Sequence, residues 1–500
     1  MSAGTWSPLP SPDVDGITDS SPADEASPSP GTGWEGGASR RFVALAAARA
    51  LTQAVGLGWF IMSARLLDDG QFGLLATGLT FFALFAGIGD LGMTRTIVRH
   101  VAGDPSLLWP AMRHTSMVRI VGGLVTAGLV VAALFVFGSS VSLAIVALAG
   151  LIATASGITE LGYAALRSTG FVVSEVRMLV AERVAFVAIA FLAIHRGHGA
   201  WGVLIAYLAT NSASAAAVTL IAWRRRSPNP RPMPALVDRQ SRFTAAEFAL
   251  ATLSPRSSPL LLTLFAAPAT VGVFVAAQRP IEAISLLALS TAAPVLPIVR
   301  SRLVAGRPDA ESAATSVVGA LSTAMVPLVC WFVVAPASAL HILFGSGRYP
   351  GAELALRLLA VTALTWSFRG VAEFVLLARD RAHTFLWILA AGTICNLGLG
   401  AALVAAHGAA GVAIATLTAE LLMTALLVPR LWHVGRGADR AAAIRAVRLG
   451  APTVALAVVT GSLVVLARSS SAVVVAVVGL ATLAAIALAA DRIRALDGAS

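Results

Sequence analysis

Apolar residues recur along this chain in long blocks, and polar residues gather in the short segments between them. Each block holds about twenty residues, the length of a helix that crosses the hydrocarbon core of a bilayer. A helix satisfies its own backbone polar groups, as a span in lipid must. The pattern predicts an all-α polytopic membrane protein with fourteen spans, at residues 43–63, 72–92, 117–137, 140–160, 178–195, 200–222, 244–266, 270–297, 314–340, 352–378, 384–405, 409–428, 449–467 and 471–490.

Residues 1–38 do not share this pattern. They are rich in Ser, Pro, Gly and Asp, too polar to build a core, and are expected to be disordered. They also lack the basic and apolar regions of a signal peptide. We therefore interpret them as a cytoplasmic tail.

Composition supports the membrane interpretation and excludes several kinds of function. Only 12% of the residues are charged, with a mean hydropathy of +0.83, whereas soluble domains have about 25% charged residues. The net charge is +11, and all 36 basic residues are arginine. A P-loop needs a lysine, so P-loop ATPase chemistry is excluded. A basic chain can indicate a nucleic-acid partner, but these arginines lie in short loops between spans. We expect no nucleic-acid partner, no metal, no cofactor and no catalytic residue.

The arginines also predict which loops face the cytoplasm. Cytoplasmic loops of membrane proteins are enriched in Lys and Arg. With the N-terminus inside, twenty-seven arginines fall in inner segments and four in outer loops, Arg65, Arg196, Arg348 and Arg468. A miscount by one helix would destroy this alternation. The sequence therefore predicts both termini in the cytoplasm. The absence of lysine, with abundant Ala and Gly, suggests a GC-rich bacterial genome, so the expected location is the inner membrane of a bacterium.

A short phrase occurs twice in the chain. HGAWGVLIAYLA at 198–209 and HGAAGVAIATLT at 407–418 share eight of twelve positions, and each lies at an outer turn, six helices apart. An even shift keeps the orientation, which indicates a parallel repeat. Gly73 and Gly272 form a second pair of outer-turn glycines at a similar offset. We expect an N-terminal lobe at 39–226 (helices 1–6), a C-terminal lobe at 240–430 (helices 7–12), and helices 13 and 14 at 445–492.

Three segments resemble the multidrug/oligosaccharidyl-lipid/polysaccharide (MOP) exporter superfamily, and most closely its Wzx-type polysaccharide-unit flippases. They are ARLLDDGQFGLLATGLTFFALFAGIGDLGMTRTIVRHVA at 64–102, HILFGSGRYPGAELALRLLAV at 341–361, and CNLGLGAALVAAHGAAGVAIATLTAE at 395–420. The resemblance covers roughly residues 40–430. Its motifs are loose and specific for the family rather than for a substrate. Fourteen helices are typical of the branches that handle polysaccharide units and lipid-linked precursors.

The resemblance implies a flippase that moves an undecaprenyl-pyrophosphate-linked oligosaccharide by alternating access, for cell-surface polysaccharide biosynthesis. Its partners would be the lipid-linked oligosaccharide, membrane lipids, and a polysaccharide polymerase with glycosyltransferases. A peptidoglycan-precursor flippase and a multidrug antiporter are the alternatives within the superfamily. A membrane glycosyltransferase or ligase fits less well, because every predicted outer loop is short.

Charged residues inside spans are costly unless they face a polar cavity, so they are the candidate site residues. Arg256 and Arg279 lie at matching depth on either side of the turn near residue 268, each next to a proline. Guanidinium groups bind phosphate bidentately, so this pair could hold a pyrophosphate; alternatively Glu282 neutralises Arg279 as an i,i+3 partner. Arg49 and Gln53 share a face of the first span, where Arg49 either lines the cavity or snorkels to the surface.

Four further residues are candidates for ion or proton coupling or for structural ion pairs. Arg369 and Glu373 are spaced as an i,i+4 pair. Glu247 and Glu420 are carboxylates in predicted helices 7 and 12. Asp90, at the inner end of the second span, is interpreted as a packing or capping group.

Overall fold

The computed structural model describes residues 33–90, 93–139, 141–227, 239–292, 301, 310–378, 381–432, 459–460, 463–464 and 471–497. These residues are helical apart from short connections, and no strand occurs among them. Eight of the described helices are long and apolar enough to cross a membrane. The chain is therefore a multi-pass membrane protein.

The helices of the first half are α1 (Gly33–Leu66), α2 (Asp69–Asp90), α3 (Met93–Gly103), a 3₁₀ turn η1 (Pro105–Leu107), α4 (Leu108–Val136), α5 (Leu143–Ser168), α6 (Val172–His195) and α7 (Gly199–Arg224). Those of the second half are α8 (Arg239–Phe265), α9 (Pro268–Ala292), α11 (Ala310–Val334), α12 (Pro336–Phe344), α13 (Ala352–Ala378), α14 (Ala382–Trp432) and α16 (Ser471–Asp497). Most predicted spans overlap one of these helices.

Several elements differ from the sequence-based prediction. Helix α1 begins at Gly33, inside the segment predicted as a tail, while residues 1–32 lie outside the described residues. The predicted span 314–340 is two helices, because the chain leaves the helical conformation at Ala335 and α12 starts with Pro336. The predicted spans 384–405 and 409–428 are both in α14, which is broken at Gly408. Most of the predicted span 449–467 lies outside the described residues, which include only 459–460 and 463–464 of it.

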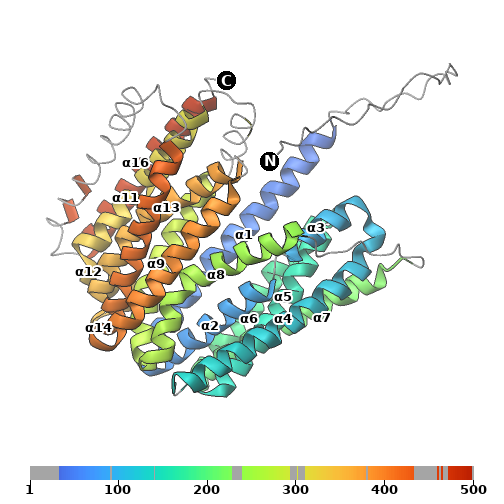
Figure 1. The fold of residues 1–500 in the computed structure, drawn as a ribbon, viewed down its shortest axis with the longest axis horizontal. Coiled ribbons are helices and arrows are strands. Elements are labelled where there is room, and N and C mark those ends of the chain that lie inside the picture. Colours follow the sequence, from blue (N-terminus) through green and yellow to red (C-terminus); the bar gives the residue numbers. More distant parts are fainter. Residues whose placement is uncertain are drawn as a thin grey trace, which may run out of the picture.

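Helices α2–α7 gather on one side of the molecule, and α9, α11–α14 and α16 gather on the other (Figure 1). Helices α2 and α8 join the two groups, since α2 packs against α4, α5 and α7 as well as against α8 and α9. Two glycines of α2 make this approach possible. A Cβ atom on Gly73 would lie 1.9 Å from the carbonyl oxygen of Pro268, and one on Gly87 would lie 2.0 Å from the Thr252 methyl carbon.

The two copies of the repeated phrase have a glycine with a positive φ at the same position. Gly199 has φ +52° and Gly408 has φ +50°, a left-handed conformation that glycine adopts without steric cost. Each packs on the start of an outer-turn helix: a Cβ on Gly199 would lie 2.6 Å from Gln71 Oε1, and one on Gly408 would lie 3.4 Å from Thr270 Cγ2.

Six turns therefore meet at one end of the molecule, which we call the closed end. They are the α1–α2, α4–α5, α6–α7, α8–α9 and α12–α13 turns and the break at Gly408. All six were predicted to lie on the same side of the membrane.

A buried ion pair fixes the packing of α2, α4 and α5. The Arg119 guanidinium of α4 donates to the Asp90 carboxylate and to the carbonyl of Gly157. A Cβ at Gly157 would lie 2.6 Å from the Arg119 side chain, so the arginine can cross α5 only over a glycine. Thr94 Oγ1 donates to the same carboxylate at 2.6 Å. Asp90 thus has the packing role that was predicted, with Arg119 as a partner that was not.

Candidate functional site

The first polar cluster lies between α8 and α9, and a proline helps to build it. Pro259 has no N–H, so it leaves the carbonyl of Pro255 without its helical donor. Gln278 Nε2 of α9 donates to this carbonyl at 3.3 Å. Beside this contact, Arg256 NH1 of α8 lies 3.2 Å from Glu282 Oε1, and Arg279 NH1 of α9 lies 2.9 Å from Glu282 Oε2. One carboxylate is therefore shared by two guanidinium groups.

The cluster is partly accessible and faces the first half of the chain. The side chains of Arg256, Arg279 and Glu282 are 23%, 27% and 16% exposed. The Arg279 guanidinium carbon lies 5.4 Å from the centre of the Phe60 ring of α1, within the range of a cation–π contact. The structure thus brings together the two arginines that the sequence placed at one depth and the glutamate that it offered as a partner of Arg279, with one net positive charge.

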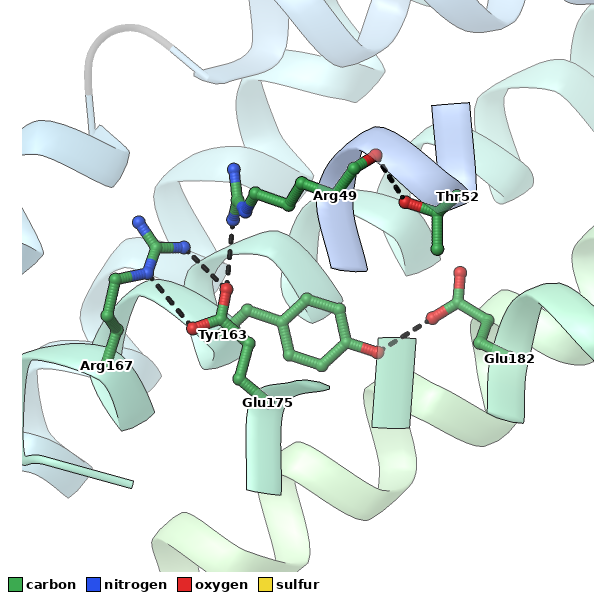
Figure 2. A network of polar contacts seen from close by, with 6 residues as sticks. All are labelled: Arg49, Thr52, Tyr163, Arg167, Glu175 and Glu182. Carbon is green, nitrogen blue, oxygen red and sulfur yellow. Dashed lines mark hydrogen bonds and ion pairs between the residues drawn. The ribbon is translucent and has the colours of Figure 1, made fainter. Parts of the chain in front are cut away.

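The second polar cluster joins α1, α5 and α6 (Figure 2). Glu175 of α6 is fully buried and is again shared by two arginines. Arg49 NH2 lies 3.0 Å from Glu175 Oε1, and Arg167 of α5 donates Nε–H at 3.0 Å and NH2 at 2.7 Å to the two carboxylate oxygens. Both guanidinium groups remain partly exposed, 45% for Arg49 and 36% for Arg167.

Figure 2 also shows Tyr163, whose hydroxyl donates to Glu182 Oε2 at 2.9 Å. Arg183, the next residue on α6, packs on α1, because a Cβ at Gly56 would lie 3.6 Å from its guanidinium. Sequence reasoning missed Glu175, Tyr163 and Glu182 and assigned Arg167 to a loop. The spacing was a signal, since carboxylates seven residues apart share one face of a helix, but Glu175 lay outside the predicted span 178–195 and belongs to the helix only in α6.

The third polar cluster lies within the second half, between α8, α13 and α14. Arg369 Nε of α13 lies 3.3 Å from Glu420 Oε2 of α14. Next to them, Asn396 Nδ2 donates to Ser257 Oγ at 2.7 Å and Ser258 Oγ at 3.0 Å. Of these residues, Glu420, Asn396 and Ser258 line a small enclosed cavity between α8, α9, α13 and α14.

The remaining predicted site residues lie at the edges of these clusters. Gln53 is exposed on α1, one turn from Arg49. Glu373 and Arg369 both lie on α13, and their i,i+4 pairing stays a prediction. The observed partner of Arg369 is Glu420. Glu247 belongs to α8, and its side chain lies outside the described residues.

Reciprocal hydrogen bonds join α1 to the α12–α13 turn at the closed end. Arg65 donates Nε–H to the carbonyl of Leu343 at 2.8 Å. In the other direction, Arg348 donates to the carbonyl of Ala64 at 2.7 Å and the Tyr349 hydroxyl donates to the same oxygen at 2.7 Å. Burial raises the pKa of Tyr349 to about 12. Two helix C-termini thus have their free carbonyls capped by a partner from the other half.

The clusters act through charge and hydrogen bonding. Among the described residues, no group of three or more His, Cys, Asp or Glu side chains is placed to hold a metal ion. Two partly exposed arginines around one carboxylate can bind an anion by exchange with that carboxylate.

The chain matches the family described as polysaccharide biosynthesis protein over residues 39–301. None of the curated proteins matches it in sequence. Among solved structures, it is similar to the lipid II flippase MurJ in an inward closed conformation, with a TM-score of 0.70 and 12% identity over 89% of this chain and 98% of that one.

Two further solved structures show the same architecture. One is a multidrug resistance MATE family transporter of the MOP superfamily in an inward-facing conformation, with a TM-score of 0.56 and 17% identity over 76% of this chain and 94% of that chain. The other is a MOP superfamily transporter from Pyrococcus furiosus, with a TM-score of 0.52 and 15% identity over 78% and 94%. The fold is therefore that of the MurJ and MATE transporters.

Proposed function

Since the chain belongs to the polysaccharide biosynthesis protein family, within the MOP superfamily, we propose that it is a flippase for a lipid-linked oligosaccharide in the bacterial cytoplasmic membrane. Its substrate would be an undecaprenyl-pyrophosphate-linked glycan, used to build a cell-surface polysaccharide. Its partners would be the lipid-linked oligosaccharide, membrane lipids, and a polysaccharide polymerase with glycosyltransferases. Both termini would lie in the cytoplasm, as the arginine distribution predicts.

The observation that carries this proposal is the cluster of Arg256, Arg279 and Glu282. A pyrophosphate carries two or more negative charges, and guanidinium groups bind phosphate oxygens through paired N–H donors. The two arginines are held on neighbouring helices by one shared carboxylate. A headgroup that replaces Glu282 would meet both guanidinium groups at once. Arg49 and Arg167 around Glu175 form a second site of the same design.

Alternating access would come from two related six-helix lobes and two additional C-terminal helices. The similar positive φ angles of Gly199 and Gly408, and their positions against Gln71 and Thr270 at the starts of α2 and α9, support the duplication. In a parallel repeat, the site lies at the interface of the lobes and rocking of one lobe against the other exposes it in turn. Arg279 against Phe60 fits such an interface.

The test is transport by purified protein in liposomes that contain a fluorescent undecaprenyl-pyrophosphate oligosaccharide. Arg256→Gln and Arg279→Gln should each lower the flipping rate at least tenfold, since one charged hydrogen bond contributes about 1.5–3 kcal/mol. Arg113→Gln, on an exposed arginine of α4, is the matched control and should flip normally. Unchanged flipping in both cluster variants, with normal membrane insertion, would rule out this cluster as the headgroup site.

The peptidoglycan precursor is the alternative substrate, and the similarity to the lipid II flippase is the observation that favours it. Both lipids carry a pyrophosphate, so the arginines do not separate them. Deletion of the gene does: loss of viability indicates the peptidoglycan precursor, and loss of capsule or exopolysaccharide indicates the other glycan. A multidrug antiporter for cationic drugs would favour an acidic cavity rather than two net-positive clusters.

A further inference from the structure

A groove of about 420 Å³ opens on the surface of the first half, where α4, α5 and α7 meet. Its walls are almost entirely apolar. They include Trp109 of α4, Ile158 of α5, and Ala215, Ala216, Leu220 and Trp223 of α7. The small side chains of Ala215 and Ala216 leave the space between the helices unfilled.

The groove faces the surroundings of the helix bundle rather than the polar clusters. Leu151 lies two turns before Ile158 on the same face of α5 and is 58% exposed. On α4, Val121 and Leu124 are 60% and 68% exposed. Apolar surface of this kind on membrane-spanning helices contacts lipid chains. The groove follows α7 from Trp223 to Ala215, a distance of about 12 Å at 1.5 Å per residue.

Three consecutive arginines, Arg224, Arg225 and Arg226, stand at the mouth of the groove, where α7 ends. The guanidinium carbon of Arg226 lies 4.8 Å from the centre of the Trp223 ring, which lines the groove. That of Arg225 lies 3.5 Å from the Phe171 ring. All three are exposed, and none pairs with a carboxylate among the described residues. The apolar groove therefore ends at a positive charge that no described group neutralises.

We propose that this groove and its arginines form a binding site for an anionic glycerophospholipid of the surrounding membrane. One acyl chain would occupy the groove, and the phosphate would contact Arg226 and Arg224. Tryptophans at the membrane–water boundary prefer the headgroup level, which is where Trp109 and Trp223 would lie. Basic pockets between helices at this boundary are suited to acidic headgroups.

The charge and the shape together select this ligand. A soluble anion would satisfy the arginines but leave the groove empty, and a zwitterionic lipid would fill the groove but leave the arginines with less compensation. A soluble partner protein would not reach a groove that lies along lipid-facing helices. This site differs from the arginine–glutamate clusters because it contains no carboxylate that an anion must replace.

Native mass spectrometry of the purified, full-length protein tests the proposal, with phosphatidylglycerol and phosphatidylcholine added separately. Wild-type protein should bind phosphatidylglycerol more tightly. Arg226→Gln should weaken that binding about 5-fold, and the Arg224→Gln/Arg226→Gln pair about 25-fold, because each basic side chain near an acidic headgroup contributes about 1 kcal/mol. Arg430→Gln, at the exposed end of α14, is the matched control and should leave binding unchanged.

A second variant tests the groove without altering charge. Ala216→Leu places a larger side chain in the groove and should weaken phosphatidylglycerol binding, whereas Ala401→Leu, on an exposed position of α14, should not. Equal binding of the two lipids would overturn the proposal. Undiminished phosphatidylglycerol binding by Ala216→Leu would also overturn it, because surface charge alone would then explain the binding. Displacement of phosphatidylglycerol from this site by the undecaprenyl-linked substrate would also overturn it, because the groove would then belong to the transport route.

Discussion

Replacing Gly73 by alanine should force α2 and α9 apart where they cross at the closed end. A Cβ at this position would lie 1.9 Å from the carbonyl oxygen of Pro268, whereas an ordinary contact is 3.4 Å or more. The two helix ends must therefore separate by about 1.5 Å. The obstacle is backbone rather than a flexible side chain, so it cannot be relieved by rotation, and overpacking of this kind costs about 1–3 kcal/mol.

In an alternating-access transporter, the substitution destabilises the conformation in which the turns of the closed end are in contact. If α2 and α9 separate at this crossing in the opposite conformation, the equilibrium shifts toward that conformation by about 5-fold to 150-fold. Spin labels on Arg196→Cys and Ser346→Cys, both exposed residues on turns of the closed end, report the separation. Cys330 and Cys395 are first replaced by alanine.

Electron–electron double resonance should show a longer label–label distance for Gly73→Ala than for the parent protein. Gly128→Ala is the matched control, because a Cβ there meets nothing within 4 Å. Both changes raise helix propensity equally, so the comparison isolates the steric effect. The reasoning would be refuted if the two variants gave the same distance distribution and the same melting temperature.

Two further predictions concern stability. Asp90→Ala should lower the free energy of unfolding by about 3–5 kcal/mol in denaturant titrations, because it leaves the Arg119 charge buried without its partner. The double variant Asp90→Ala/Arg119→Met should lose much less stability. An equal loss in both variants would contradict this account. The folded state raises the pKa of Tyr349 to about 12 from an ordinary value of 10.0, so the stability from its protonated hydroxyl should be complete below pH 10 and lost as the pH rises through 12. The melting temperature of wild-type protein should therefore fall more steeply over this range than that of Tyr349→Phe, and parallel curves would contradict it.

The apolar blocks predict most helix positions because a span in lipid has few alternatives to a helix. The deviations have local causes. Pro336 starts a new helix where the hydropathy pattern continues without a break. The segment Met93–Gly103 is the short amphipathic helix α3, and it was predicted as part of a loop because it is too short and too polar for a span. Its buried residues Ile97 and Val101 are one turn apart, which is the pattern of a helix lying on a surface.

The candidate site residues also include some that the sequence could associate and some that it could not. Arg256, Arg279 and Glu282 could be associated from the sequence because the two helices are joined by a tight turn, which fixes the depth of each residue. Arg49 and Glu175 are 126 positions apart, and the contact between α1 and α6 depends on tertiary packing that no local pattern encodes. Whether any of these residues contacts substrate remains a prediction.

The ratio of arginines to carboxylates separates two kinds of charged cluster in this protein. Arg119 with Asp90 is a one-to-one pair whose side chains are 7% and 5% exposed, so it is neutral and inaccessible. Glu282 and Glu175, in contrast, are each shared by two arginines that remain partly exposed. A shared carboxylate holds two guanidinium groups in position and leaves one positive charge uncompensated. A cluster built only for stability gains nothing from that excess charge, because an unpaired charge at low dielectric is unfavourable. An anionic headgroup with two charges would supply the missing compensation, and the described residues of each half of the chain contain one cluster of this two-to-one design.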